Sequence, residues 1–98
     1  MVCEVMGKVK KAYSLTDEKT GETKKGMACR LSFHVEPYEN NPKEQIYGEG
    51  ERFIELRCPE NICDAVEVGN TLSVETDDKI TRVKSVMVQI DGGGFMPL

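Results

Sequence analysis

MACRLSFHVE, residues 27–36, alternates apolar and polar side chains without interruption. Apolar side chains occupy every second position, which is the period of a β-strand with one face in a core and the other in water. The sequence therefore predicts a strand over residues 27–36, with its inner face formed by Met27, Cys29, Leu31, Phe33 and Val35.

The residues before this stretch predict a partner strand over residues 3–14. Val5, Gly7 and Val9 continue an apolar alternation, so Lys8 and Lys10 are expected to face solvent. Residues 16–25 are polar and contain a central glycine, a composition typical of a hairpin connection.

The residues after it predict three more strands. A segment rich in Pro, Asn and Gly over residues 37–50 indicates a loop. Apolar and β-branched runs beyond it predict strands over residues 51–58, 71–76 and 80–90. The apolar positions of the last strand change parity, which predicts a bulge near Lys84 or Ser85.

A short helix is predicted over residues 60–66, between the third and fourth strands. Proline is tolerated in a first helical turn, so Pro59 suits the start, and Glu60 complements the helix dipole. The domain is expected to cover residues 1–91. Three consecutive glycines then predict a flexible tail over residues 92–98.

This order of elements predicts an all-β, mainly antiparallel fold, namely a five-stranded OB-like Greek-key barrel with one short helix between strands three and four. The segments MGKVKKAYSL, KGMACRLSFHVE, EVGNTLSVE and ITRVKSVMV occur in that order. In pattern and order they resemble small single-stranded-DNA-binding proteins of phages and mobile elements, including the filamentous-phage gene V type. The resemblance spans about residues 3–90 and implies a role in DNA replication, recombination or transfer.

Composition excludes several classes of protein. The 98 residues carry a net charge of −4 and 39% apolar side chains, which is typical of a globular chain. Residues 1–30 hold seven Lys/Arg and four Asp/Glu, whereas the rest hold six and thirteen, so a basic face remains possible. No apolar run approaches the roughly 20 residues of a membrane span. The first residues do not follow the pattern of a signal peptide, so a cytoplasmic protein is expected.

The cysteines and the catalytic residue types predict neither a metal site nor an enzyme. Cysteines stand at positions 3, 29, 58 and 63 with no CxxC spacing, so we expect reduced thiols and no zinc. The sequence has one histidine, no nucleophile motif and no phosphate-binding glycine loop. We expect no cofactor.

Binding of single-stranded nucleic acid needs a cationic path for phosphates and flat side chains on which bases stack. The candidates on outward positions, strand ends and the hairpin are Lys8, Lys10, Tyr13, Lys24, Lys25, Arg30, His34, Phe53 and Arg57. Phe53 is out of register with Ile54 and Leu56, which indicates either a stacking platform or a twisted strand with Phe53 in the core.

Two functions fit these residues. The first is sequence-tolerant binding of single-stranded DNA, or RNA, by a homodimer. The second is a protein-interaction module, in which an OB-like barrel docks to a protein partner without binding nucleic acid. A binder should gather Lys, Arg and aromatic side chains on one face, whereas an adaptor should present an apolar patch.

Overall fold

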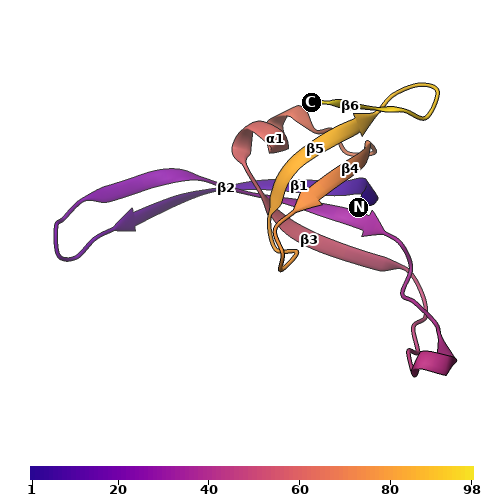
Figure 1. Ribbon diagram of the computed structural model, residues 1–98. Helices are drawn as coiled ribbons and strands as arrows, with labels where there is room; N and C mark the ends of the chain where they lie inside the picture. Colours follow the sequence, from indigo (N-terminus) through magenta and orange to yellow (C-terminus); the bar gives the residue numbers. More distant parts are fainter.

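The computed structural model describes residues 1–98 as one antiparallel sheet with a short helix beside it (Figure 1). The strands are β1 (Val2–Thr16), β2 (Thr23–Val35), β3 (Arg52–Cys58), β4 (Thr71–Thr76), β5 (Val83–Gln89) and β6 (Phe95–Pro97). Helix α1 spans Glu60–Ala65, and a 3-10 turn, η1, spans Pro42–Glu44. The strand order is β3-β2-β1-β4-β5-β6. None of the helices is long and apolar enough to cross a membrane.

The prediction of a mainly antiparallel all-β fold, with one short helix between the third and fourth strands, is confirmed. The prediction of a closed five-stranded barrel is wrong, because six strands form an open sheet. One isolated parallel bridge joins Arg57 of β3 to Arg82, and the Arg57 N–H donates to the Thr81 carbonyl at 3.1 Å. We call this contact the seam. It stays short because β3 ends before Pro59, which has no N–H to donate.

The start of β5 differs from the prediction. Ile80, expected at the beginning of the last strand, lies in a turn with a φ of 53°, and pairing with β4 begins at Val83. The predicted bulge is confirmed. Ser85 pairs with Glu75 and Val83 pairs with Thr76, so Lys84 is the extra residue between them. Val83 and Val86, three residues apart, are consequently both buried.

A second bulge, which the sequence did not reveal, occurs in β1. Val5 pairs with Phe33 and Gly7 with Ser32, so Met6 is the extra residue. The bulge moves the following side chains to the opposite face. Lys8 is therefore on the core side, opposite buried Leu31, and Val9 is exposed, which corrects the predicted orientation of the strand from Gly7 onward.

The sixth strand corrects the predicted strand count. Gly92 and Gly93 have φ angles of 94° and 87°, a region that glycine enters at little cost. They turn the chain so that the Ile90 N–H donates to the Gly94 carbonyl at 2.8 Å. The last residues then pair with β5, with Phe95 opposite Gln89. The glycine run that predicted a tail thus forms a hairpin turn.

The core contains 14 buried side chains, all aliphatic, aromatic or cysteine, packed inside the curled sheet and under α1. All four cysteines are buried and free. Burial raises the pKa of Cys3 to about 11 and that of Cys58 to about 12, so these thiols are protonated at neutral pH. No cluster of three or more metal-ligating side chains is present.

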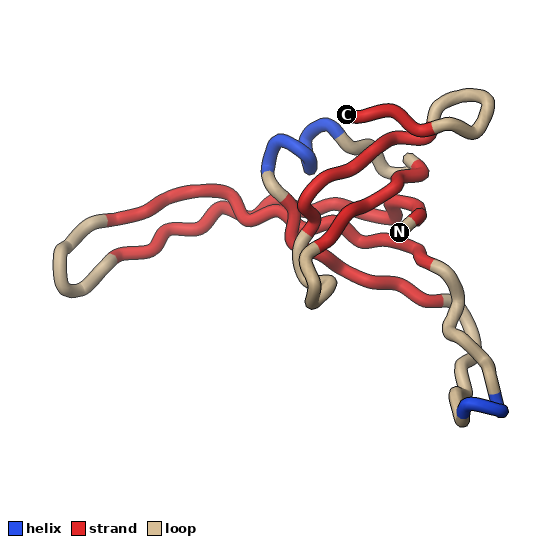
Figure 2. The backbone as a smooth tube through the Cα atoms, viewed as in Figure 1, coloured by secondary structure: helices blue, strands red, loops and turns tan.

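The molecule is elongated. Its radius of gyration is 17.0 Å, whereas a compact chain of this size has about 13 Å. The outer parts of β1 and β2 project as a two-stranded ribbon, residues 11–28, which joins no other strand (Figure 1). Figure 2 shows this ribbon and, at the other end of the molecule, the long loop that carries η1.

Candidate nucleic-acid interface

The solvent-facing sides of β1, β2 and β3 form one continuous surface, which we call the outer face. Its cross-strand pairs on β2 and β3 are Arg30–Arg57, Ser32–Glu55 and His34–Phe53. Phe53 is 57% exposed, so the interpretation of Phe53 as a core residue is wrong. Its ring stacks on His34, with centroids 5.0 Å apart and an angle of 27° between planes.

Carboxylates restrain part of this surface. His34 Nε2 contacts the Glu51 carboxylate, which fixes the orientation of the imidazole. Arg30 makes an exposed ion pair with Glu55 at 3.4 Å. Arg57 has no ion-pair partner, and neither has Arg82, which lies beside Arg57 across the seam.

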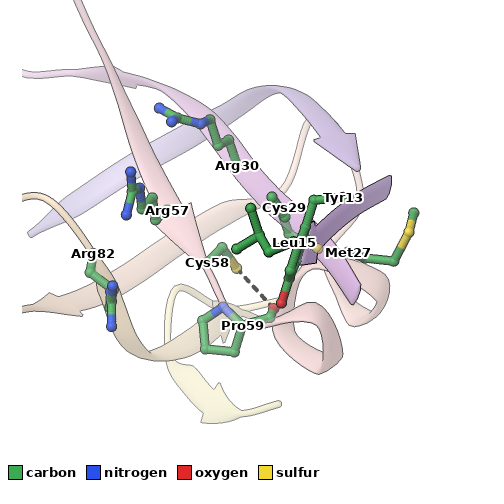
Figure 3. Close-up of a pocket in the computed structure, with 10 residues that line it drawn as sticks. Tyr13, Leu15, Met27, Cys29, Arg30, Arg57, Cys58, Pro59 and Arg82 are labelled. Carbon is green, nitrogen blue, oxygen red and sulfur yellow. Dashed lines mark hydrogen bonds between the residues drawn. The ribbon is translucent and has the colours of Figure 1, made fainter. Parts of the chain in front are cut away.

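The three arginines line two adjoining hollows. The first, which we call the root pocket, has a volume of about 460 Å³ and lies where β3 ends and the ribbon leaves the sheet. Its other walls are mainly apolar and come from Tyr13, Leu15, Met27, Cys29, Cys58 and Pro59. The second, of about 480 Å³, lies between the arginines, Glu55 and Thr81. Figure 3 shows the arginines along one side of the root pocket and Tyr13, Leu15 and Pro59 along the other, with the Met27 side chain pointing outward.

Tyr13 depends on a glycine in the neighbouring strand. Tyr13 pairs with Gly26, and a Cβ added at position 26 would lie 2.6 Å from the tyrosine hydroxyl. That distance is shorter than a van der Waals contact, so any larger residue would displace the ring. Gly26 therefore lets Tyr13 lie across the ribbon at the edge of the root pocket.

A turn beside the seam positions Arg82. The Asp77 carboxylate accepts hydrogen bonds from the N–H groups of Thr81 and Arg82, at 2.7 and 3.0 Å, and from the Thr81 hydroxyl at 2.6 Å. These hydrogen bonds, those of Thr81 first, lower the pKa of Asp77 to about 2. At neutral pH the Asp77 carboxylate is ionised and keeps these hydrogen bonds. The turn that they hold places Arg82 at the root pocket.

Two of the predicted lysines contact helix α1 and not the outer face. Lys8 Nζ donates to the carbonyls of Cys63 and Val66 at 3.1 and 2.8 Å, and so caps the carboxyl end of the helix. Lys10 pairs with Asp64 at 2.8 Å and Glu60 at 3.3 Å. The hydrogen bond to Asp64, followed by that to Glu60, raises the pKa of Lys10 to about 12.

The hairpin lysines divide between the two faces of the ribbon. Lys24 pairs with Leu15, on the side of Tyr13 and Arg30, whereas Lys25 pairs with Ser14 on the opposite side. Of the predicted set, the structure therefore brings together on the outer face Tyr13, Lys24, Arg30, His34, Phe53 and Arg57.

Sequence reasoning missed Lys11 and Arg82. Lys11 reaches the outer face only because the Met6 bulge changes the parity of β1. Arg82 follows the Asp77 turn, a signal visible in the sequence, but its approach to Arg57 depends on how the sheet curls. No protein-family model, no curated protein and no solved structure matches this chain.

Proposed function

We propose that this protein binds single-stranded nucleic acid, primarily DNA, along the outer face of β1, β2 and β3, without strong sequence preference. The observation that carries the proposal is the exposed His34–Phe53 stack on the same face as Arg30 and Arg57. Flat rings supply surfaces for bases and arginines supply contacts to phosphates, which are the two requirements of single-strand binding.

The distribution of charge supports the proposal despite the net charge of −4. The ribbon contributes Lys11 and Lys24 to the outer face, and Arg30 and Arg57 lie at its base with Arg82 beside them. Glu55 is the carboxylate among them, while Glu4 and Glu51 lie near His34 at the other end. Phosphates would follow the cationic part, because the local field and not the total charge governs their approach.

The strand arrangement supports an OB-like interpretation of the curled sheet. β1 lies between β2 and β4, α1 follows β3, and the seam brings β3 beside the segment that enters β5. Proteins of this type bind oligonucleotides on the face formed by their second and third strands. We extend the proposal to a homodimer acting in replication, recombination or transfer of a phage or mobile element.

Replacement of Phe53 by Ala tests the proposal. Loss of one stacking surface costs about 1–3 kcal/mol per base, so affinity for a labelled oligo-dT should fall by about tenfold to a hundredfold. Fluorescence anisotropy at low and moderate salt measures this change. Tyr47→Ala is the matched control, because Tyr47 is 77% exposed in the distant loop. Absence of binding by the wild-type protein at low salt would exclude the function.

The competing function, a protein-interaction module, is favoured by apolar side chains on the ribbon. Leu15 is 63% exposed and Met27 39%, and neither edge of the ribbon is paired. An adaptor would use these groups for a protein partner, and would leave oligo-dT unbound in the same titration.

A further inference from the structure

The root pocket has the size of a small-ligand site and two chemically distinct walls. Pockets for small ligands typically measure about 300–1,000 Å³, and the root pocket has about 460 Å³. It opens at the end of β3, where the edge of β2 at Met27 and Ala28 loses its neighbour. One wall is cationic and the other is apolar (Figure 3).

The charge of the cationic wall matches a phosphate monoester. Arg30, Arg57 and Arg82 contribute three positive charges, and Glu55, paired with Arg30 at 3.4 Å, contributes one negative charge, which leaves +2. A phosphate monoester carries about −1.5 to −2 at neutral pH. An internal phosphodiester of a nucleic acid carries about −1. The wall therefore favours a terminal phosphate over an internal one.

The guanidinium groups on this wall have N–H donors that no group of the chain accepts. Each arginine offers five N–H donors, and Arg57 and Arg82 make no side-chain hydrogen bond or ion pair within the chain. Arginine binds phosphate oxygens in pairs, which selects for the geometry of the anion as well as for its charge. The Asp77 turn holds the backbone of Arg82, so this side chain starts from a fixed position.

The apolar wall suits a flat, uncharged ring. Tyr13, Leu15, Met27 and Pro59 border the same pocket as the arginines. A nucleobase placed on this wall would remove apolar surface from water while its phosphate remained at the arginines.

We propose that the root pocket binds a nucleotide through its terminal phosphate monoester, with Arg30, Arg57 and Arg82 holding the phosphate and the apolar wall holding the base. Two sources have this chemistry, namely a free nucleoside monophosphate and the phosphorylated end of a single strand. The second source rests on the proposed function, and the first does not.

The test compares three internally labelled oligo-dT strands of about 8 nucleotides, one with a 5′-phosphate, one with a 3′-phosphate and one with hydroxyls at both ends. A charge-assisted contact predicts that one phosphorylated strand binds about tenfold to a hundredfold more tightly than the hydroxyl strand. Calorimetric titration with thymidine 5′-monophosphate and 3′-monophosphate measures the free nucleotides. Arg82→Gln should abolish the preference, and Lys84→Gln, which removes an exposed charge outside the pocket, should preserve it.

The outcomes separate the two proposals. Equal binding of all three strands, with neither monophosphate bound, would overturn the pocket and leave single-strand binding intact. Binding of a monophosphate that Arg82→Gln abolishes, with no strand bound, would support the pocket and overturn the proposed function. Binding of neither strands nor monophosphates at low salt would overturn both, and an unchanged preference in Arg82→Gln would overturn the assigned phosphate contacts.

Discussion

Asp77 shows how a single carboxylate organises a turn beside the root pocket. It accepts three hydrogen bonds from Thr81 and Arg82 and so delays β5 until Val83. The same turn holds Ile80 at a φ of 53°, a conformation unfavourable for a β-branched residue. Since each of these contacts favours the charged form of Asp77, the geometry of the turn depends on ionisation.

We predict that stability falls in acid partly through this group. The pKa of Asp77 is about 2 in the folded protein and 3.8 as its ordinary value. A lowered pKa adds to the free energy of unfolding above pH 4, and this contribution disappears as the pH falls toward 2. Urea unfolding between pH 2 and pH 5 should therefore show a shallower acid loss for Asp77→Asn than for the wild type.

Asp78→Asn provides the control, because Asp78 lies in the same turn and accepts no hydrogen bond from the chain. It should retain the acid loss of the wild type. Identical pH profiles for Asp77→Asn and the wild type would show that the turn does not depend on the charge.

At the scale of the elements, the sequence predicted strands wherever one face is buried. β2 and β3 alternate clearly because their inner side chains, such as Leu31 and Leu56, are in the core. Pro59 likewise indicated the start of α1. The outer half of β1 carries no such signal, since Val9 and Leu15 are exposed although apolar. The Met6 bulge, and with it the inward direction of Lys8, could not be predicted from alternation.

The site was predicted less completely than the fold. Phe53 and Arg57 were predictable because an outward position follows from the register of a single strand. The root pocket joins residues from the ribbon, the end of β3 and the turn before β5. Such a combination depends on sheet curvature, which local sequence patterns do not encode.

Strand β6 offers a test at this scale. It makes three residue pairs with β5 at the edge of the sheet, and only Phe95 among its residues is partly buried. We predict that deletion of residues 92–98 leaves the domain folded but removes about 1 kcal/mol, which lowers the Tm by about 4–8 °C.

Thermal unfolding followed by circular dichroism measures this change, and removal of Leu98 alone, which lies outside β6, is the control. An unchanged Tm would show that β6 adds no stability. Loss of cooperative unfolding would show that the sheet cannot form without it.

The whole molecule is polarised. The loop over residues 36–51 carries five glutamates and one lysine and projects at the end of the molecule opposite the ribbon (Figure 1). The arginines of the root pocket lie at the base of the ribbon. An approaching strand would therefore meet attraction at one end of the long axis and repulsion at the other. The salt dependence of binding should identify the side chains that contact phosphates.

We predict that Arg30→Gln reduces the slope of log affinity against log salt by about 0.7 for a single strand. Lys10→Gln should leave the slope unchanged, because Lys10 is paired with Glu60 and Asp64 on the other side of the sheet. Anisotropy titrations of oligo-dT over a series of salt concentrations measure both slopes. A reduced slope for Lys10→Gln would place the phosphate path along α1.

The seam has an energetic consequence for the fold itself. A single backbone bridge joins β3 to the entry of β5, and the two residues that make it are both arginines without an ion-pair partner. Mutual repulsion of these like charges opposes the curling of the sheet at the one place where it approaches closure. An anion held between them would cancel that repulsion, so ligand occupancy and sheet closure are thermodynamically linked. If the root pocket binds an anion as proposed, the sheet is expected to be most tightly closed in the anion-bound protein.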